Sequence, residues 1–560
     1  MTPECLPFSQ IPGTTGLFHD FLFDHSKVEI FYPRTARLAD WQNREVITYS
    51  DERRRQLAAI LERQNRAWDA SPQTLQNISR LAAGASALVT GQQVGLFGGP
   101  PFALFKALTA IHLAAEATRE GRECVPVFWL ATEDHDLAEV NQAYFPDNGA
   151  LRSLTAPTEG TPGAPVGCLV FGEGIARAVE EAASLLGDSE ISDLLRRYYR
   201  AGEAFGAAFA RLFSRLFAKW GVILLDAADP ELHRVAAPIY RQALQRSAQL
   251  DEALLARGKE LEAAGYHQQV RVTPSSTLLF SLQNGVRMPI HRRPNSRGAE
   301  EFIVGEETFR AEELLARIES APQAFSPNVL LRPVVQDYLL PTLAYTGGAA
   351  EIAYFAQAAV VYRELLGRVT PILPRFSATL VEPKSKALLD RYGLSLLDVF
   401  HGPEKLREEL AARALPQALQ TAFDQADESL DQSLAMIRER LERLDKTLAD
   451  AAVNAGTKMH HQLDSLRSKA ARAESRHTEI LGRHADLLST MLYPNKGLQE
   501  RTIAGVYFLA EHGVELLQGV YDAMRADCVD HQVIPLQASY AESMVSNSSS
   551  DSTRVRPDSR

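Results

Sequence analysis

Residues 85–136, ASALVTGQQVGLFGGPPFALFKALTAIHLAAEATREGRECVPVFWLATEDHD, contain the pattern that decides the fold. The apolar residues 87–89 lead into a glycine-rich segment, and apolar residues then recur at helical spacing from Leu104 to Ala115. A second apolar run, 125–131, follows. A strand, a glycine-rich turn, a helix and a second strand form a βαβ unit, which predicts a parallel sheet with right-handed crossovers.

Three later apolar segments predict further strands of the same sheet: Val222–Leu225, Val329–Arg332 and Thr370–Leu373. Helical patterns lie between them, as in α/β proteins. Residues 1–380 are therefore predicted to form a doubly wound α/β core.

Two segments interrupt this core and are predicted to be insertions, at about 143–175 and 265–310. The first is rich in glycine, proline and threonine. The second contains Gln283-Asn284-Gly285 between two apolar stretches, which predicts a β-hairpin.

The character of the chain changes in residues 381–535, which we predict to be a helical domain. Apolar residues repeat there at seven-residue intervals, with a change of frame at Asn454-Ala455-Gly456. This pattern predicts two long helices in an antiparallel coiled-coil arm at about 417–490, although two ordinary amphipathic helices of a bundle remain an alternative. The polar, serine-rich residues 536–560 are expected to be a disordered tail.

The composition narrows the class of protein. A length of 560 residues allows about three or four domains. The net charge of −11 argues against a dedicated nucleic-acid binder, which would carry a basic face. The chain has no signal-peptide pattern and no apolar run that could span a membrane, so we expect a soluble cytoplasmic protein. Its four cysteines are widely separated, which predicts reduced thiols rather than disulfides or a zinc site.

The glycine-rich turn is the first candidate for a binding site, because ligands of open parallel sheets bind beyond the carboxyl ends of the strands. Thr90, Gln92 and Gln93 leave such an end, and Gly98 and Gly99 allow close backbone approach. The following helix would direct free N–H groups toward a phosphate or carboxylate. The glycine spacing matches neither a Walker loop nor GxGxxG, so a purely structural turn is the alternative.

A second candidate is the cluster Glu133-Asp134-His135-Asp136, at the end of the next predicted strand. A carboxylate beside a histidine suits general acid–base chemistry, and the same groups could ligate a metal. The alternative is a solvated helix start with an N-cap. Because the two strand ends are neighbours, the cluster and the glycine-rich turn together make a stronger case for a site.

Three further segments carry polar residues in suggestive positions. Arg332, Gln336, Tyr345 and Glu351 lie in an otherwise apolar run and suggest a binding wall, although Glu351 could simply serve a helix dipole. The turn 493–501 could hold a nucleotide or merely cap helices. Residues 382–386, EPKSK, superficially resemble a lysine-rich phosphate loop, but an exposed helix start is the more frequent explanation.

Four motifs in this order resemble the cysteine-adding ligase family of bacillithiol synthesis, BshC. They are TGQQVGLFGGPPFALFKAL, FWLATEDHDLAEVN, NVLLRPVVQDYLLPTLAYTGGAAEIAYFAQ and LYPNKGLQERT. The resemblance extends to about Ala526, and the departures lie in the serine-rich tail and in residues 154–171. It implies a Rossmann-like core related to class I synthetases, two connecting-peptide insertions, and a C-terminal α-helical coiled-coil domain that forms a homodimer.

The resemblance also implies a reaction. L-Cysteine would be joined to glucosaminyl-malate through an amide bond to the glucosamine amine, with ATP activating the cysteine carboxylate and ATP or ADP bound. The sequence does not decide between an acyl-adenylate and an acyl-phosphate.

On this resemblance each candidate residue receives a role. The expected catalytic residues are His135, Asp136 and Glu133. The expected substrate-binding residues are Thr90, Gln92, Gln93, Gly98, Gly99, Asn141, Arg332, Gln336, Tyr345 and Glu351, with Arg332 the best candidate for the malate carboxylates. The expected nucleotide-binding residues are Tyr493, Asn495 and Lys496. No metal is assigned.

Two rival functions remain open at this point. A non-catalytic nucleotide-binding adaptor would use the coiled coil to hold a partner. An enzyme that charges RNA is also compatible with the core, but the acidic charge and the lack of a basic stripe argue against it.

Overall fold

The computed structural model describes residues 3–41, 49–294, 300–413, 417–477, 479–525 and 527–537. The predicted tail lies almost entirely outside these residues. Among the described helices, none is both long and apolar enough to cross a membrane.

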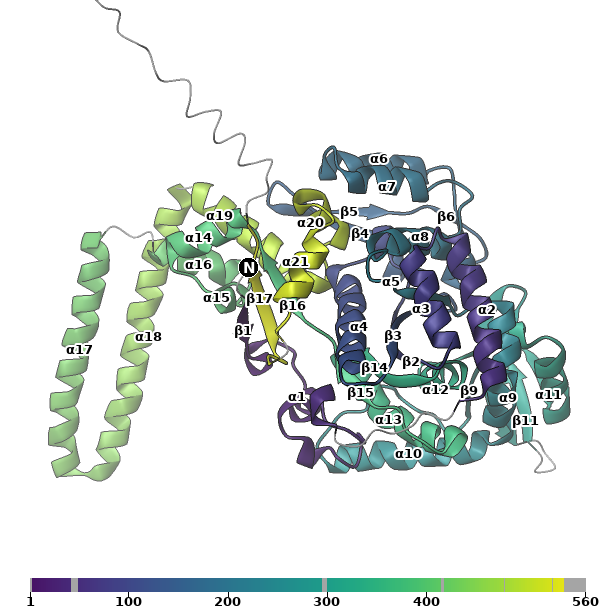
Figure 1. Ribbon diagram of the computed structural model, residues 1–560. Helices are drawn as coiled ribbons and strands as arrows, with labels where there is room; N and C mark the ends of the chain where they lie inside the picture. The colour runs from purple at the N-terminus through teal and green to yellow at the C-terminus, as the bar shows by residue number, and fades with distance from the viewer. Residues whose placement is uncertain are drawn as a thin grey trace, which may run out of the picture.

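A five-stranded parallel sheet forms the centre of the molecule (Figure 1). Its strands are β2 (Ser86–Gln92), β3 (Cys124–Leu130), β8 (Ile223–Asp226), β14 (Thr342–Gly347) and β15 (Ile372–Pro374). The spatial order β15-β14-β2-β3-β8 reverses direction between β14 and β2, as in a Rossmann fold. The prediction of a doubly wound parallel sheet is confirmed.

The first crossover follows the predicted βαβ unit. Helix α4 (Pro101–Arg119) begins with a proline at its first position and packs on β2 and β3. Helix α2 (Asp51–Ala67) packs on β8, and helix α3 (Pro72–Ala82) packs on both β3 and β8. Strand β3 is buried along its whole length, which explains its continuous apolar sequence.

One predicted strand is wrong. Arg332 does not end a strand but begins helix α12 (Arg332–Leu339), and the strands on either side are β13 (Phe325–Pro327) and β14. The Asn328 carboxamide accepts the N–H groups of Leu330 and Leu331, which turns the chain before the helix. A short buried apolar run does not by itself distinguish a strand from a helix entry.

Both predicted insertion segments contain β-structure. The first contains the hairpin of β4 (Gln142–Asp147) and β5 (Ala150–Thr155). The second contains most of a sheet in the order β12-β11-β10-β9-β13.

The predicted Asn284-Gly285 turn joins β9 (Ser276–Gln283) to β10 (Val286–Pro294). Its two residues have φ of 51° and 80°, as a type I′ hairpin turn requires. This hairpin prediction is confirmed.

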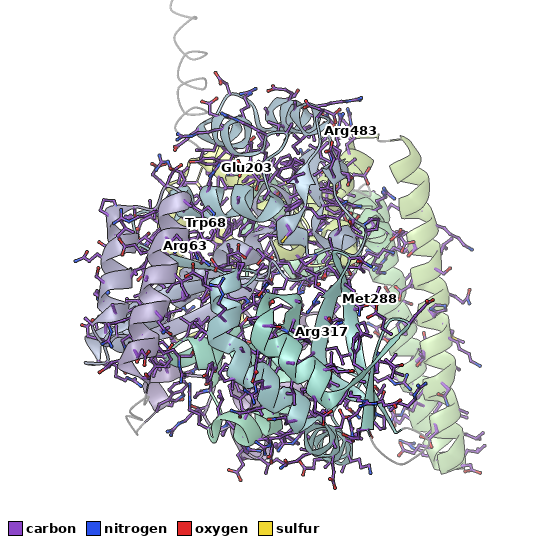
Figure 2. The ribbon with its side chains drawn as sticks, turned by 90° about the vertical axis from the view of Figure 1, so that its right-hand side faces the viewer. Arg63, Trp68, Glu203, Met288, Arg317 and Arg483 are labelled. Carbon is purple, nitrogen blue, oxygen red and sulfur yellow. A yellow bond between two sulfur atoms is a disulfide. The ribbon has the colours of Figure 1, made fainter. Side chains whose placement is uncertain are left out.

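The C-terminal region carries a two-helix arm that stands away from the sheet (Figures 1 and 2). Helices α17 (Gln417–Leu444) and α18 (Lys446–His477) lie side by side and antiparallel, which confirms the coiled-coil prediction. The chain reverses at Asp445, whereas the change of frame at 454–456 lies within α18. A Cβ on Gly456 would lie 2.9 Å from Leu434, so this glycine permits the close approach of the two helices.

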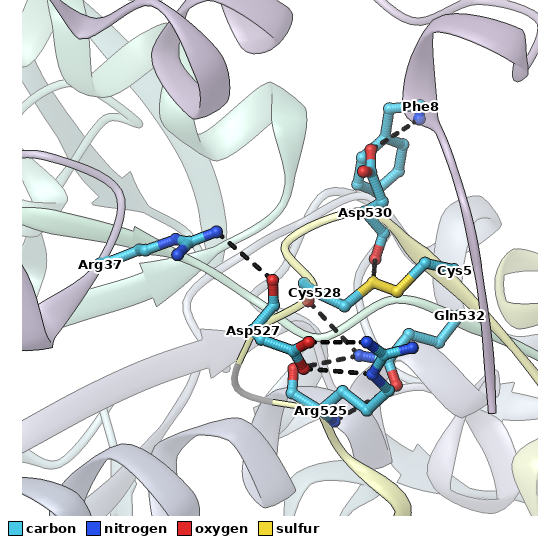
Figure 3. Close-up of a disulfide and its surroundings, with 8 residues drawn as sticks. All are labelled: Cys5, Phe8, Arg37, Arg525, Asp527, Cys528, Asp530 and Gln532. Atoms are coloured by element: carbon cyan, nitrogen blue, oxygen red, sulfur yellow. Dashed lines mark hydrogen bonds and ion pairs between the residues drawn. A yellow bond between two sulfur atoms is a disulfide. The ribbon is translucent and has the colours of Figure 1, made fainter. Parts of the chain in front are cut away.

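Cys5 and Cys528 form a disulfide, so the prediction of reduced thiols is wrong for this pair (Figure 3). Cys5 lies in β1 (Glu4–Leu6), which pairs antiparallel with β17 (His531–Pro535). The two cysteines come from opposite ends of the chain, so their spacing gave no signal. Cys124 and Cys168 are free.

This disulfide leads to a first prediction. Replacing Cys528 by serine should lower the free energy of unfolding by about 2–4 kcal/mol, because the cross-link restricts the unfolded chain. Thermal unfolding with and without a reductant measures the effect, and Cys168→Ser is the matched control. Equal melting temperatures for the oxidised protein and the Cys528→Ser variant would contradict the prediction.

Candidate functional site

A cavity of about 410 Å3 lies at the carboxyl ends of β2 and β14, where the strand order reverses. This is the position at which open parallel sheets bind ligands. Its walls come from the glycine-rich turn, from helices of the core, from the second insertion and from the C-terminal domain. The charged residues that line it are Lys106, Glu133, Asp134, Glu139, Arg287, Arg332, Glu351, Arg375 and Arg501.

Lys106 and Glu351 form a buried ion pair in this cavity. The Lys106 ammonium lies 2.8 Å from a Glu351 carboxylate oxygen and donates to the carbonyl oxygen of Gly91 and to the Gln92 side chain, each at 2.8 Å. Burial lowers the pKa of Lys106 to about 8, against the opposing effect of Glu351. The sequence prediction missed Lys106, although it lies in the motif TGQQVGLFGGPPFALFKAL and is a charge within an otherwise apolar helix.

The Glu351 carboxylate also accepts from the Tyr345 hydroxyl and from the backbone N–H of Gly348, both at 2.7 Å. Burial alone would raise its pKa, but Lys106 and these hydrogen bonds lower it. Glu351 therefore caps the start of α13 (Ala349–Leu366) and also lines the cavity.

Arg332 adjoins this pair from the start of α12. Its guanidinium donates to Gln336 at 3.1 Å and to the Tyr354 hydroxyl at 2.9 Å, and it lies over the Tyr345 ring. Arg332, Tyr345 and Glu351 line the cavity, whereas Gln336 is fully buried behind Arg332. The structure thus brings the predicted wall together, with Gln336 as its support.

Glu133 also lines the cavity and is only 9 % exposed. Burial raises its pKa to about 8, although Arg287 opposes the shift. Its Oε1 atom has no hydrogen-bond partner among the described residues, and His233 lies 3.4 Å away. Because burial lowers the pKa of His233 to about 4, that imidazole is neutral near pH 7. Glu133 can therefore exchange a proton near neutral pH.

The other members of the acidic cluster have different surroundings. His135 does not line the cavity; its Nδ1 lies 3.2 Å from the Arg287 guanidinium at the rim. Asp136 caps helix α5 (Leu137–Val140) by accepting the N–H of Glu139, whereas the helix-start alternative expected Thr132 or Asp134 as the cap. Asp134 does line the cavity and accepts from the Gln93 side chain at 2.8 Å.

The glycine-rich turn is divided between the cavity and the protein interior. Gln92 and Gln93 line the cavity, but the Thr90 hydroxyl is buried and donates to the carbonyl oxygen of Thr346. Gly98 and Gly99 have φ of 87° and 72° and do not line this cavity.

The carbonyl oxygen of Gly99 accepts from the N–H of Gly505 at 2.8 Å, so this part of the turn holds the C-terminal domain. Asn141, which follows α5, likewise does not line the cavity.

Two arginines of the cavity, Arg287 and Arg375, were missed by the sequence prediction, and a third, Arg501, was considered only as part of the turn 493–501. Arg287 follows the hairpin turn of the second insertion, stacks on Phe280 and donates to the carbonyl oxygen of Pro327 at 2.7 Å. Arg375 follows β15, and Arg501 comes from the C-terminal domain. Arg501 lies in the LYPNKGLQERT motif, which was the available signal.

The predicted nucleotide turn adjoins a separate cavity of about 280 Å3. Tyr493 and Lys496 line this cavity and Asn495 does not. Lys496 is mostly exposed, with its ammonium 3.6 Å from Glu404, and Tyr493 packs on the Phe400 ring.

A larger cavity of about 500 Å3 lies between the β4–β5 turn and the C-terminal helices. It surrounds the start of α14 (Pro383–Tyr392), and Lys384 and Arg483 line it; Figure 2 labels Arg483. Three buried polar atoms here have no hydrogen-bond partner among the described residues: Glu382 Oε1, Ser385 Oγ and His512 Nε2. Such atoms are costly unless water or a ligand satisfies them.

The Rossmann-type sheet, the charged cavity at its switch point and the two-helix arm define a two-domain α/β protein with a coiled-coil extension. Residues 1–376 match the family described as Bacillithiol biosynthesis BshC, N-terminal Rossmann-like domain. Residues 378–536 match Bacillithiol biosynthesis BshC, C-terminal coiled-coil domain. The chain therefore belongs to the BshC family.

Similar curated proteins carry the name "Putative cysteine ligase BshC". The protein of Koribacter versatilis is 48 % identical over 95 % of this chain and 100 % of its own length. The Solibacter usitatus protein is 38 % identical over 95 % and 99 %, and the Salinibacter ruber protein 34 % identical over 94 % and 97 %.

Proposed function

We propose that this protein is the ligase that joins L-cysteine to the glucosamine amine of glucosaminyl-malate, with ATP activating the cysteine carboxylate. The observation that carries the proposal is the charge layout of the cavity. Arg332 offers a cation for carboxylates, whereas Glu133 and Asp134 offer carboxylates for an amine. Family membership and the names of the relatives support the same activity.

The proposed step forms an amide. The amine nitrogen attacks the carbonyl carbon of the activated cysteine, a carbon–nitrogen bond forms, and the bond from that carbon to the phosphate oxygen breaks. The proton lost by the nitrogen passes to the Glu133 carboxylate, whose pKa of about 8 suits a base that works near neutral pH. In this proposal Arg332 holds the malate carboxylates, and His135 acts from the rim through its contact with Arg287.

For the nucleotide, the cavity at the start of α14 has stronger support than the turn 493–496. It has a buried Ser385 hydroxyl without a hydrogen-bond partner among the described residues, a lysine, an arginine and the positive end of a helix, and Glu382 Oε1 lies 3.6 Å from His512 Nε2. The turn has one mostly exposed lysine, which lies near Glu404. We therefore expect the ATP phosphates beside Lys384 and Arg483.

This assignment gives a second prediction. Arg483→Met should weaken ATP binding at least tenfold, because a charge-assisted contact to phosphate is lost. Lys496→Met is the matched control and should leave the affinity unchanged. Isothermal titration calorimetry measures the ATP affinity of both variants. Weaker binding by Lys496→Met with unchanged binding by Arg483→Met would instead support the turn 493–496 as the nucleotide site.

The arm is the proposed surface for homodimerisation. Several large apolar side chains on its two helices are exposed in the single chain: Met436, Ile437, Leu444, Leu448, Val453, Met459 and Leu466. A second copy of the arm would cover such side chains. Light scattering of the purified protein measures its oligomeric state directly.

The decisive experiment is thiol profiling of cells that lack this gene. The proposal expects accumulated glucosaminyl-malate, loss of its cysteine-capped product, and restoration of both by the wild-type gene. Normal thiol content without accumulation would remove the proposed ligase activity. Recovery by a Glu133→Gln gene would instead favour the adaptor, which needs no catalytic residue.

A further inference from the structure

We infer that Arg501, supplied by the C-terminal domain, is an anion-binding group of the main cavity and takes a carboxylate or phosphate of the ligand. The identity of this ligand rests on the proposed function. The anion subsite itself follows from the contacts of the described residues. The site would then be complete only when both domains contribute to it.

The other cations of the cavity already have partners. Lys106 pairs with Glu351, and Arg332 donates to Gln336 and Tyr354. The Arg287 guanidinium donates to Ser326 and to the carbonyl oxygen of Pro327.

Arg375 forms a bidentate pair with Glu500, with distances of 2.6 and 3.1 Å. Among the described residues, the Arg501 side chain has neither a hydrogen bond nor an ion pair, and its one ring contact is with Phe102. Arg501 is an exposed residue, so its guanidinium donors are open to water or to a ligand.

Three cations surround the ring of Phe102, in the first turn of α4. The distances to the ring centroid are 5.7 Å for Lys106, 5.7 Å for Arg375 and 6.0 Å for Arg501. Two carboxylates, Glu351 and Glu500, pair with the first two cations. One positive charge is left around this ring, and it is the charge of Arg501.

The backbone that carries Arg501 is held firmly in place. The buried Gln499 side chain accepts the N–H of Leu380 and donates to the carbonyl oxygens of Leu380 and Met491. The Glu500 carboxylate accepts from Ser377 and from the N–H of Ala378 in addition to Arg375. A side chain on so fixed a segment loses little conformational freedom when it binds.

Arg501 also stands where cavities meet. It lines the main cavity, the 280 Å3 cavity beside Tyr493, and a third of about 240 Å3 beside Gly99. A guanidinium presents a planar fork that matches a carboxylate or a phosphate with two parallel hydrogen bonds. Arg501 could therefore bind a carboxylate or a phosphate. The experiment below decides which ligand carries the anion.

The test compares Arg501→Met, Arg501→Lys and wild type by isothermal titration calorimetry with L-cysteine, glucosaminyl-malate and ATP. Arg501→Met keeps an aliphatic stem and removes the charge, and Arg501→Lys keeps the charge and removes the fork. Arg177→Met is the matched control, because Arg177 is 86 % exposed and, within the described part of the chain, pairs with its helix neighbour Glu181 alone.

We expect Arg501→Met to lower the affinity for at least one of these three ligands by tenfold or more. The affinity of Arg501→Lys should lie between those of Arg501→Met and wild type, and that of Arg177→Met should equal wild type. A lower affinity for glucosaminyl-malate or L-cysteine identifies the anion bound by Arg501 as a carboxylate, and a lower affinity for ATP identifies it as a phosphate. Unchanged affinities, or the same loss in Arg177→Met, would overturn the inference.

A different result would bear on the proposed function alone. If the wild-type protein bound none of the three ligands, the proposed substrates would be wrong. The anion subsite would then be decided with malonate and inorganic phosphate as simple probes, and equal binding by wild type and Arg501→Met would refute it.

Discussion

Replacing Glu133 by glutamine is expected to lower the rate of cysteine ligation by a factor of about 10²–10⁴, the usual contribution of a general base. Glutamine keeps the shape of the side chain but cannot take up the amine proton. Ligation rates from purified protein, followed by mass spectrometry of the thiol product, measure the effect. Glu62→Gln is the control, because Glu62 lies outside the cavity and pairs with Arg66 on the surface of α2.

The pH dependence tests the same residue. Because burial raises the pKa of Glu133 to about 8, its carboxylate form increases as the pH rises through that value, and the wild-type rate should rise with it. The Glu133→Gln variant should lack this rise. A wild-type rate that is flat between pH 6 and 9, or a variant that keeps the rise, would exclude Glu133 as the base.

The protonation of Glu133 also affects stability, with a definite sign. Its pKa in the folded protein lies above the ordinary carboxyl value, so the stability that it contributes is full below the ordinary value and is lost as the pH rises through about 8. The free energy of unfolding of the wild type should therefore fall more steeply than that of Glu133→Gln over this window.

Replacing Glu500 by glutamine is expected to destabilise the protein by about 3–5 kcal/mol, because a buried arginine would lose its charged partner. Glu500 is 1 % exposed and accepts two hydrogen bonds from the equally buried Arg375. Denaturant unfolding measures the loss. A change within about 0.5 kcal/mol, as at an ordinary surface site, would contradict the expectation.

A double variant sharpens this prediction. Arg375→Met combined with Glu500→Met replaces the ion pair by apolar side chains and should recover much of the loss, since no charge is left buried and unpaired. The pH provides an independent check. The pair lowers the pKa of Glu500, so its contribution is present above the ordinary carboxyl pKa and disappears as the pH falls through the lowered value.

The predictable part of the fold rests on local patterns. The glycine-rich segment between two apolar runs and the Asn284-Gly285 turn each restrict the backbone within a few residues, so the sequence alone was enough for the βαβ unit and the hairpin. The heptads likewise predicted the arm. The predicted strand at Val329–Arg332 was wrong because Leu330 and Leu331 are buried just before a helix, and burial alone does not set secondary structure.

The candidate site was predictable only in part. Gln92, Gln93 and Glu133 end or follow predicted strands of one sheet, so their meeting at one edge follows from parallel topology, whereas Tyr345 lies within β14, where no strand was predicted. Lys106 was missed because its position within an apolar helix resembles a core position.

Gly98 and Gly99 differ from expectation for a tertiary reason. They lie in the same turn as Gln93 but contact other parts of the chain. Gly99 receives the N–H of Gly505, and a Cβ on Gly98 would lie 3.1 Å from Leu212.

The sequence by itself determined the parallel core, the hairpin and the arm, because periodicity and turn residues act over short distances. Only the tertiary structure decided that Cys5 meets Cys528, that Arg375 pairs with Glu500, and that Arg501 enters a cavity of the other domain. These contacts join residues more than a hundred positions apart, or residues in separate domains. Such pairs meet through the packing of whole elements, which leaves no signal in the spacing along the chain.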